Sequence, residues 1–276
     1  MQPGVQLRRE KADEILSTKE AKLYQVMVGA LGYLMNCTRP DLAFAVGKVA
    51  KFAAYLTMTH MAAVKQIFRY VKGFMNTKHM LTGTNKNLVA YFDASWADNV
   101  NDSCSTYGYT ILYRNSAMLW KSHKHKGVSL SMTDAEYLAV TETTRDLYWI
   151  KNIFDGAKLP FETLIEMRGD TFNANGIASG TIVPNRTRHI EIRERYVSEK
   201  VKDGMIMMKW VPTTEQTADI FTKSLPEDIF IKHAKNLGLC FQDHECFVCF
   251  TTFHSGNSLH KHIKTAYILV EGIKLS

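Results

Sequence analysis

The first part of the chain carries apolar residues at helical spacing, interrupted by two short breaks. Ser17 and Glu20 stand three residues apart, as in the capping box that opens many helices. Pro40 suits the first turn of a helix, where a backbone N–H has no helical partner. We therefore expect a small helical bundle over residues 17–80, after a flexible N-terminus at 1–16. Its helices are predicted at about residues 17–36, 40–55 and 59–75.

From residue 85 the pattern changes to short apolar strands, and then to strands that alternate with helices. Only Arg114 and Asn115 separate the second and third strands, which predicts an antiparallel meander. The later alternation predicts an α/β domain with a mixed sheet flanked by helices, over residues 85–239. Strands are expected at residues 85–92, 106–114, 116–122, 164–167 and 205–211. Helices are expected at residues 133–154, 174–179, 188–201 and from about 214.

Four acids stand at the ends of these elements or on a face that should be buried. Asp93 ends the first strand, and Asp170 follows the fourth. Asp219 is expected in the first turn of the last helix, after a capping-box-like pattern at 213–216. Glu136, near the start of the long helix, shares a narrow stripe with mostly apolar residues, so it should face the sheet. The other members of the stripe are Ala139, Thr143, Leu147, Ile150 and Phe154.

These acids have two interpretations. Each one alone fits an ordinary role, as a turn former after a strand or as an acid near a helix N-terminus. Together they allow convergence at one edge of the sheet, where clustered carboxylates need a cation in order to stay ionised. Carboxylate oxygens suit Mg²⁺ or Mn²⁺, and two such ions about 4 Å apart can activate a water for phosphoryl displacement. Spacing alone does not decide between the two interpretations.

Charge and composition narrow the class of protein. The 276 residues include 34 Lys and Arg against 27 Asp and Glu, and the resulting net charge of +7 favours a polyanionic partner such as nucleic acid. No apolar run approaches the roughly 18 residues of a membrane span, and the N-terminus lacks the pattern of a secretory signal. The odd number of cysteines, five, does not indicate a disulfide framework. We expect an intracellular protein, cytoplasmic or nuclear, without a membrane partner.

Several motifs, in their order along the chain, resemble one family. Over roughly residues 20–239 the chain contains YQVMVGALGYLMNCTRPDLAFAVGKVAKF, YFDASWADNVNDSCSTYGY, LWKSHKHKGVSLSMTDAEYLAV, GDTFNANGIAS and WVPTTEQTADIFTK. This series resembles the C-terminal part of a copia-type LTR retrotransposon polyprotein, where the end of the reverse transcriptase precedes a ribonuclease H domain. The resemblance implies a ribonuclease H-like fold for residues 85–239. It also implies that residues 17–80 correspond to the thumb or connection region of the reverse transcriptase.

The same resemblance implies an enzyme that hydrolyses the RNA strand of RNA/DNA hybrids with two Mg²⁺ or Mn²⁺ ions. Its partners would be the RNA/DNA hybrid and the rest of a retroelement polyprotein. The implied catalytic and metal-binding residues are Asp93, Glu136, Asp170 and Asp219. The residues implied to contact nucleic acid are Ser95, Thr106, Lys121, Asn173, Arg188 and His189.

Some features depart from the family pattern. The paired-Asp metal motif of the polymerase is absent, so no DNA synthesis is expected from this chain. Thr171 and Phe172 replace the usual Asn-Gln after Asp170, and residues 212–216 lack the His that many ribonucleases H carry there. These departures leave open a second interpretation, a catalytically inactive remnant that only binds nucleic acid. A third, another nuclease or integrase of the same fold, is disfavoured by the sequence around Glu136 and Asp219.

The tail over residues 240–276 lies outside the resemblance and contains a zinc-finger-like segment. Cys246, Cys249 and His262 match three ligands of a Cys-Cys-His-His finger. The expected fourth ligand is missing unless His254 or His260 substitutes. We interpret the segment as a degenerate finger and leave zinc binding open.

Overall fold

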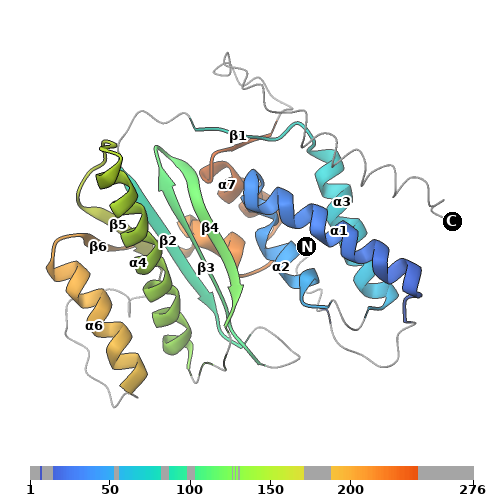
Figure 1. Ribbon diagram of the computed structural model, residues 1–276, viewed down its shortest axis with the longest axis horizontal. Coiled ribbons are helices and arrows are strands. Elements are labelled where there is room, and N and C mark those ends of the chain that lie inside the picture. The colour runs from blue at the N-terminus through green and yellow to red at the C-terminus, as the bar shows by residue number, and fades with distance from the viewer. Residues whose placement is uncertain are drawn as a thin grey trace. The chain divides into compact units, whose positions relative to one another are not determined.

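The computed structural model describes residues 7, 15–52, 56–81, 87–97, 103–125, 127, 129, 131–170 and 188–241, with side chains in the last range from residue 192. These residues fall into two compact units, one of Leu7–Lys78 with residues 240–241, the other of His79–Leu239 (Figure 1). Within the described residues, no helix is both long and apolar enough to cross a membrane. The short helix expected at 174–179 lies outside them.

The first unit contains the three expected helices. The predicted capping box opens the first of them: Ser17 N and Oγ donate to Glu20 Oε2 at 2.9 and 2.6 Å, and Glu20 N donates to Ser17 Oγ at 3.4 Å. Pro40 begins a 3₁₀ turn that leads directly into the second helix. The elements are α1 (Thr18–Cys37), η1 (Pro40–Leu42), α2 (Ala43–Ala50) and α3 (Met58–Gly73).

A buried ion pair lies beside the apolar core of this unit. Arg39 Nε donates to Asp41 Oδ1 at 2.9 Å, and Arg39 Nη2 donates to Asp41 Oδ2 at 2.8 Å. Tyr70 Oη also donates to Asp41 Oδ2, at 2.8 Å, while Arg39 Nη1 donates to Phe74 O at 3.3 Å. The pair therefore ties the connection between α1 and α2 to the end of α3. The core includes Tyr24, Met27, Leu31, Leu42, Val46, Val49, Val64 and Ile67.

The second unit is built on a five-stranded mixed sheet, which confirms the predicted fold class. The strand order is β4-β3-β2-β5-β6. Pairing is antiparallel between β2, β3 and β4, whereas β5 runs parallel to β2 and β6 runs parallel to β5. The strands are β2 (Leu88–Ser95), β3 (Thr106–Tyr113), β4 (Ser116–Lys124), β5 (Ile165–Gly169) and β6 (Ile206–Trp210). Two short strands, β1 (Lys78–His79) and β7 (Leu239–Cys240), form a separate pair.

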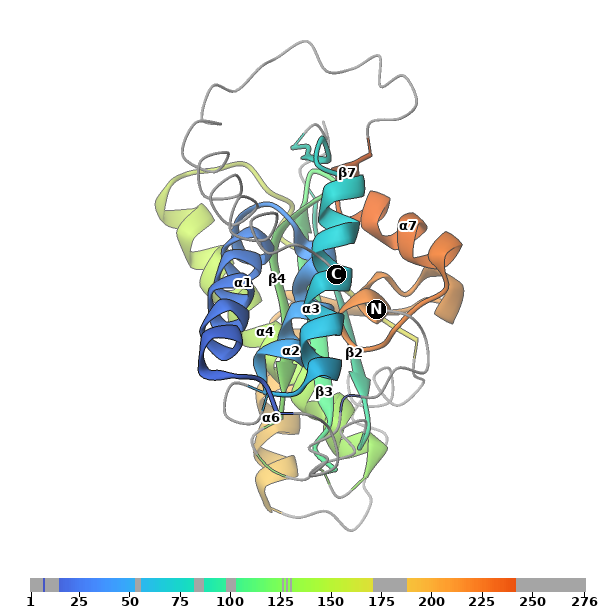
Figure 2. The ribbon, with the colours of Figure 1, turned by 90° about the vertical axis from the view of Figure 1, so that its right-hand side faces the viewer.

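One face of the sheet is covered by the long helix α4 (Met132–Gly156), and α6 (Arg188–Lys202) packs against that helix (Figure 1). The predicted stripe on α4 is confirmed, because Glu136 and every other member of the stripe are buried. The apolar members of the stripe share one core with the strand residues Ala90 and Phe92, which alternate along β2 with residues of the opposite face. The opposite face carries η3 (Thr217–Phe221) and then α7 (Glu227–Asn236), which Figure 2 shows on the far side of the strands from α4.

The first strand of the sheet, β2, lies three residues later in the chain than the predicted range 85–92. Asp93 pairs with Gly108, and the antiparallel register continues to Ser95 opposite Thr106. The expectation that Asp93 ends the strand was therefore wrong. The reason is that the partner strand supplies hydrogen bonds for two further residues, so the polar Asp93 sits inside a ladder and not at its end.

The prediction of a helix from residue 214 was also wrong. Two 3₁₀ turns, η2 (Thr213–Glu215) and η3, stand there, separated by the extended Gln216 (ψ 90°). The Gln216 side chain is buried and donates from Nε2 to Phe92 O at 3.1 Å, while its Oε1 accepts from Ala218 N at 3.3 Å. This contact with a neighbouring strand overrides the local capping pattern, because it holds Gln216 in a non-helical conformation.

Gly108 allows η3 to lie directly on the sheet. A Cβ atom at this position would lie 2.4 Å from Phe221 Cβ, well inside van der Waals contact. On the neighbouring strand β4, Ser122 Oγ donates to Phe221 O at 2.6 Å, which fixes the end of the turn. Close approach of η3 brings Asp219 next to the strand that carries Asp93.

Candidate metal centre

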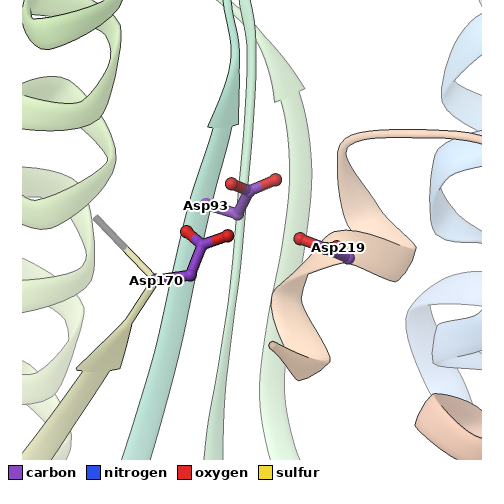
Figure 3. Close-up of side chains that lie close together, drawn as sticks. All are labelled: Asp93, Asp170 and Asp219. Atoms are coloured by element: carbon purple, nitrogen blue, oxygen red, sulfur yellow. The ribbon is translucent and has the colours of Figure 1, made fainter. Parts of the chain in front are cut away.

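Three of the four predicted acids converge in the second unit. Asp93, Asp170 and Asp219 each offer a carboxylate oxygen, and these oxygens all lie within 4.8 Å of one another. Figure 3 shows Asp93 and Asp170 on adjacent strands and Asp219 on the short helical turn opposite, with their carboxylates facing a common point. Asp93 and Asp219 are buried, and Asp170 is half-buried. Residues 126 positions apart in the chain thus form one cluster of charge.

The sheet explains why two of these acids are neighbours. Tyr91 of β2 is level with Arg168 of the parallel strand β5, so Asp93 and Asp170 stand two residues further along each strand on the same face. Because parallel strands end at the same edge of a sheet, both carboxylates lie toward its carboxyl edge. Asp219 then approaches from η3, which covers this face.

Two threonine hydroxyls orient carboxylates of the cluster, and an indole N–H holds the backbone of Asp170. Thr222 Oγ1 donates to Asp93 Oδ2, in a buried hydrogen bond between η3's end and β2. Thr213 Oγ1 donates to Asp170 Oδ2 at 3.1 Å, and Trp210 Nε1 donates to Asp170 O at 3.0 Å. These contacts come from the end of β6 and the segment that follows it, so this part of the chain fixes the positions of Asp93 on β2 and Asp170 just after β5.

The electrostatics of the cluster are those of crowded acids. Burial and the neighbouring Asp93 carboxylate raise the pKa of Asp219 to about 7, although Lys223 acts in the opposite direction. Lys223 Nζ lies 2.9 Å from Asp219 Oδ1 and 3.5 Å from Asp93 Oδ2. Burial alone would lower the pKa of Lys223, but Asp93 and Asp219 outweigh it and raise that pKa. The site therefore favours positive charge.

These residues fit a hard divalent cation. The donor set consists of carboxylate oxygens, which Mg²⁺ and Mn²⁺ prefer over softer ligands. The cluster already pairs with one cation, the Lys223 ammonium. Asp93, Asp170 and Asp219 are the residues that could hold a metal, and a metal-bound water there could attack a phosphate.

Glu136 is placed differently from the other three acids. It is buried in the first turns of α4, on the stripe that faces the sheet, as its helical position predicts. It does not belong to the group whose carboxylate oxygens lie within 4.8 Å of one another in the described part of the chain. Its role as a fourth ligand therefore stays a prediction.

The residues predicted to contact nucleic acid are only partly described. Ser95, two residues beyond Asp93, ends β2 and pairs with Thr106, the first residue of β3. Lys121 lies opposite Tyr109 on the α4 face of the sheet, where its Nζ pairs with Asp146 Oδ2 at 3.1 Å, so the structure does not bring it to the acid cluster. Outside the described residues or side chains lie Asn173, Arg188, His189, Cys246, Cys249 and His262.

Sequence reasoning missed the residues that surround the three acids. Lys223 was signalled by its spacing, because a Lys four residues after an Asp commonly forms an ion pair with it. Thr213 and Thr222 carried no comparable signal, since a Thr near a turn is usually a local capping residue. Their contacts with Asp170 and Asp93 join residues 43 and 129 positions apart, which no local pattern reveals.

A buried histidine of α7 makes the stability of the second unit sensitive to acid. His233 of α7 is fully buried, and neither ring nitrogen has a hydrogen-bond partner in the described part of the chain. Burial, with the charges of Lys232 and Lys223, lowers the pKa of His233 to about 4. The unfolded chain, where the pKa is about 6.5, therefore takes up this proton first, and stability is lost as the pH falls from about 6.5 to 4.

We expect that loss to reach about 3 kcal/mol at pH 4, and His233→Leu to remove it. Urea unfolding of the second unit, followed by tryptophan fluorescence at pH 7.5, 5.5 and 4.5, measures the difference between variant and wild type. The exposed His123→Leu is the matched control and should keep the wild-type pH dependence. Equal pH dependence of wild type and His233→Leu would show that His233 is protonated at no cost.

Comparison with known proteins places the chain among retroelement proteins. It is 34% identical to the retrovirus-related Pol polyprotein from transposon TNT 1-94 of Nicotiana tabacum over 207 residues, which are 75% of this chain and 16% of the polyprotein. It is 33% identical to the Pol polyprotein from transposon RE1 of Arabidopsis thaliana over 219 residues, which are 78% of this chain and 15% of that one. The chain therefore spans only about a sixth of the length of these relatives.

Two further comparisons are narrower. Secreted RxLR effector protein 161 of Plasmopara viticola is 41% identical over 129 residues, which are 46% of this chain and 90% of that protein. No protein-family model matches the chain. The polyproteins match three quarters of the chain, whereas the effector matches less than half of it.

Solved structures of ribonuclease H domains are similar to about half of the chain. The N-terminal RNase H domain of a Mycobacterium tuberculosis protein is 14% identical, covers 55% of this chain and 98% of its own, and gives a TM-score of 0.38. RNase H1 of the archaeon Halobacterium salinarum is 18% identical, covers 49% and 94%, and gives 0.37. The fold of the second unit is defined by the strand order and the strand directions of its sheet.

Three antiparallel strands followed by two parallel ones, with a long helix across one face, make the second unit ribonuclease H-like. The polyprotein matches cover 207 and 219 of the 276 residues. Over about three quarters of its length the chain is therefore similar to the Pol polyproteins of copia-type retrotransposons.

Proposed function

We propose that the chain is the ribonuclease H of a retroelement, a metal-dependent endonuclease that cuts the RNA strand of RNA/DNA hybrids. One observation carries the proposal: Asp93, Asp170 and Asp219, from three different elements, bring carboxylate oxygens within 4.8 Å of one another. A structural role for such a cluster is disfavoured, because crowded buried acids repel one another and cost stability. Similarity to the Pol polyproteins supports the retroelement origin.

In this proposal Asp93, Asp170 and Asp219 hold two Mg²⁺ or Mn²⁺ ions, with Glu136 as a further ligand. Such ions, when bound, lower the pKa of an attacking water and neutralise charge that develops on the phosphate. Thr222 and Thr213 hold the Asp93 and Asp170 carboxylates in fixed orientations, so little reorganisation is needed when substrate arrives. Hydrolysis then adds water to phosphorus and breaks the opposite P–O bond, and no side chain forms a covalent intermediate.

The substrate assignment rests on chemistry and not on base readout. A hybrid duplex is recognised through its phosphates, its shape and its 2′-hydroxyls, for which the net charge of +7 is favourable. Ser95 and Thr106 lie at the end of the β2–β3 pair that carries Asp93, where their hydroxyls could meet a sugar or phosphate near the cleavage point. Residues 17–80 would add affinity as the remainder of the reverse transcriptase.

A cleavage assay tests the proposal. The purified chain with Mg²⁺ or Mn²⁺ should cut the labelled RNA strand of a hybrid, and should spare duplex DNA of the same sequence. Excess EDTA should reduce cutting to background, and added Mn²⁺ should restore it. In the proposed mechanism only the divalent ion activates the attacking water and neutralises charge on the phosphate.

Two outcomes would contradict this function. Cleavage that persists in EDTA would exclude the metal mechanism. Binding of the hybrid without any cleavage, in the presence of either ion, would favour the alternative of an inactive remnant that only binds nucleic acid.

A further inference from the structure

Lys223 places a positive charge inside the acid cluster. Its Nζ lies 2.9 Å from Asp219 Oδ1 and 3.5 Å from Asp93 Oδ2, so one ammonium pairs with two of the three acids. Among the described residues, both ion pairs of Asp93 and Asp219 go to this lysine. An ammonium that lies between two carboxylates occupies the kind of position that a bound cation would take.

The lysine is less fixed than the acids that it pairs with. Its side chain is 39% exposed, whereas the side chains of Asp93 and Asp219 are 8% and 5% exposed. The acids are held by the sheet, by η3 and by the Thr222 hydroxyl. A lysine has four rotatable bonds and an end that solvates readily, so the ammonium can leave the cluster while the carboxylates stay in place.

No other lysine in the described part of the chain forms an ion pair with Asp93 or Asp219. Lys232 donates to Thr214 O at 2.8 Å, away from the acids. Lys235 of α7 is exposed and forms no ion pair with a described residue. The contrast makes Lys235 a matched control, because it has the same charge and lies in the same unit.

We propose that Lys223 is a built-in cation that competes with the divalent ion for Asp93 and Asp219, and thereby sets the ion concentration at which the site fills. The inference rests on the proposed function, because it assumes that the cluster binds divalent ions. In the metal-free protein the ammonium offsets the repulsion between the acids. A divalent ion, with twice the charge, displaces it toward solvent.

Competition predicts tighter metal binding when the ammonium is removed. Lys223→Met keeps the length of the side chain but removes its charge, and we expect it to bind Mn²⁺ about tenfold more tightly than wild type. Lys223→Arg keeps the charge and should stay close to wild type, as should Lys235→Met. Isothermal titration with Mn²⁺, on the full chain without nucleic acid, measures all four proteins.

The melting temperature of the second unit gives an independent readout. In EDTA, Lys223→Met should melt at a lower temperature than wild type, because the acids lose their counter-charge. Its melting temperature should then rise more on addition of Mn²⁺ than that of wild type. Lys235→Met should show neither change. Folding of Lys223→Met only when Mn²⁺ is present would be the extreme form of the same result.

The outcomes separate this inference from the proposed function. If wild type binds Mn²⁺ and Lys223→Met binds it equally or more weakly, Lys223 is no competitor and only this inference fails. If neither protein binds Mn²⁺ at millimolar concentration, the metal site itself fails, and the inference with it. If Lys223→Met binds Mn²⁺ and wild type does not, the competition is supported, because the ammonium then accounts for the absence of binding by wild type.

Discussion

Replacing Asp93 with Asn is expected to lower hybrid cleavage about a thousandfold or more, without weakening hybrid binding. The amide has the shape of the carboxylate, and its oxygen can still accept the hydrogen bond from Thr222 Oγ1, so the fold should persist. What it loses is the negative charge that holds a divalent ion. Since each tenfold in rate corresponds to about 1.4 kcal/mol, a loss of several kcal/mol of transition-state stabilisation gives this effect.

The measurement compares single-turnover cleavage of a labelled hybrid with its binding in a gel-shift or anisotropy assay. Asp203→Asn is the matched control, because Asp203 is an exposed acid in the turn before β6. It should cleave and bind like wild type. Unchanged cleavage by Asp93→Asn would refute the assignment of the site, and loss of binding together with cleavage would indicate a folding defect instead.

Replacing Asp41 with Ala should destabilise the first unit by about 3–5 kcal/mol. Arg39 and Asp41 are at most 5% exposed, and Arg39 is held by three hydrogen bonds to the Asp41 carboxylate. Removing the carboxylate leaves a buried guanidinium without its counter-charge, and it also removes the acceptor of the Tyr70 hydroxyl. Both consequences cost free energy that folding must supply.

Two probes separate this effect from changes in the second unit. All four tryptophans lie within His79–Leu239, so their fluorescence reports the second unit, whereas amide hydrogen exchange along α1 and α3 reports the first. Exchange should accelerate in the first unit of Asp41→Ala while the fluorescence transition stays unchanged. The double variant Arg39→Met with Asp41→Leu is the control and should recover most of the loss, because no charge is then buried. Equal instability of the double variant would show that the pair acts through shape and not through charge.

The candidate site shows how far local patterns reach. The stripe on α4 was predictable to the residue, since helical periodicity depends only on spacing, and Glu136 is buried where that periodicity places it. Asp93 was correctly singled out as an unusual acid on an apolar strand, but its place inside the strand was missed. That place depends on how far β3 continues to pair, which residues 85–93 do not encode.

The segment after β6 shows the opposite case. Its sequence has the pattern of a helix start, yet two 3₁₀ turns form because the Gln216 side chain binds the backbone of β2. Gly108 admits this segment to the sheet, and without that close approach Asp219 would not reach Asp93. Local propensity is worth fractions of a kcal/mol per residue, so a few tertiary contacts of this kind decide the outcome.

The sequence by itself determined the two kinds of architecture, the helical bundle and the mixed sheet, together with the capping box of α1 and the identity of the acids. These features follow from periodicity and from short-range hydrogen bonds, which neighbouring residues fully specify. Only the tertiary structure decided that three of the acids meet, that Glu136 lies outside their group, and that Lys223 stands among them. The reason is that charges interact through space over a few ångströms, and which residues come that close depends on strand order, register and side-chain packing across the whole unit.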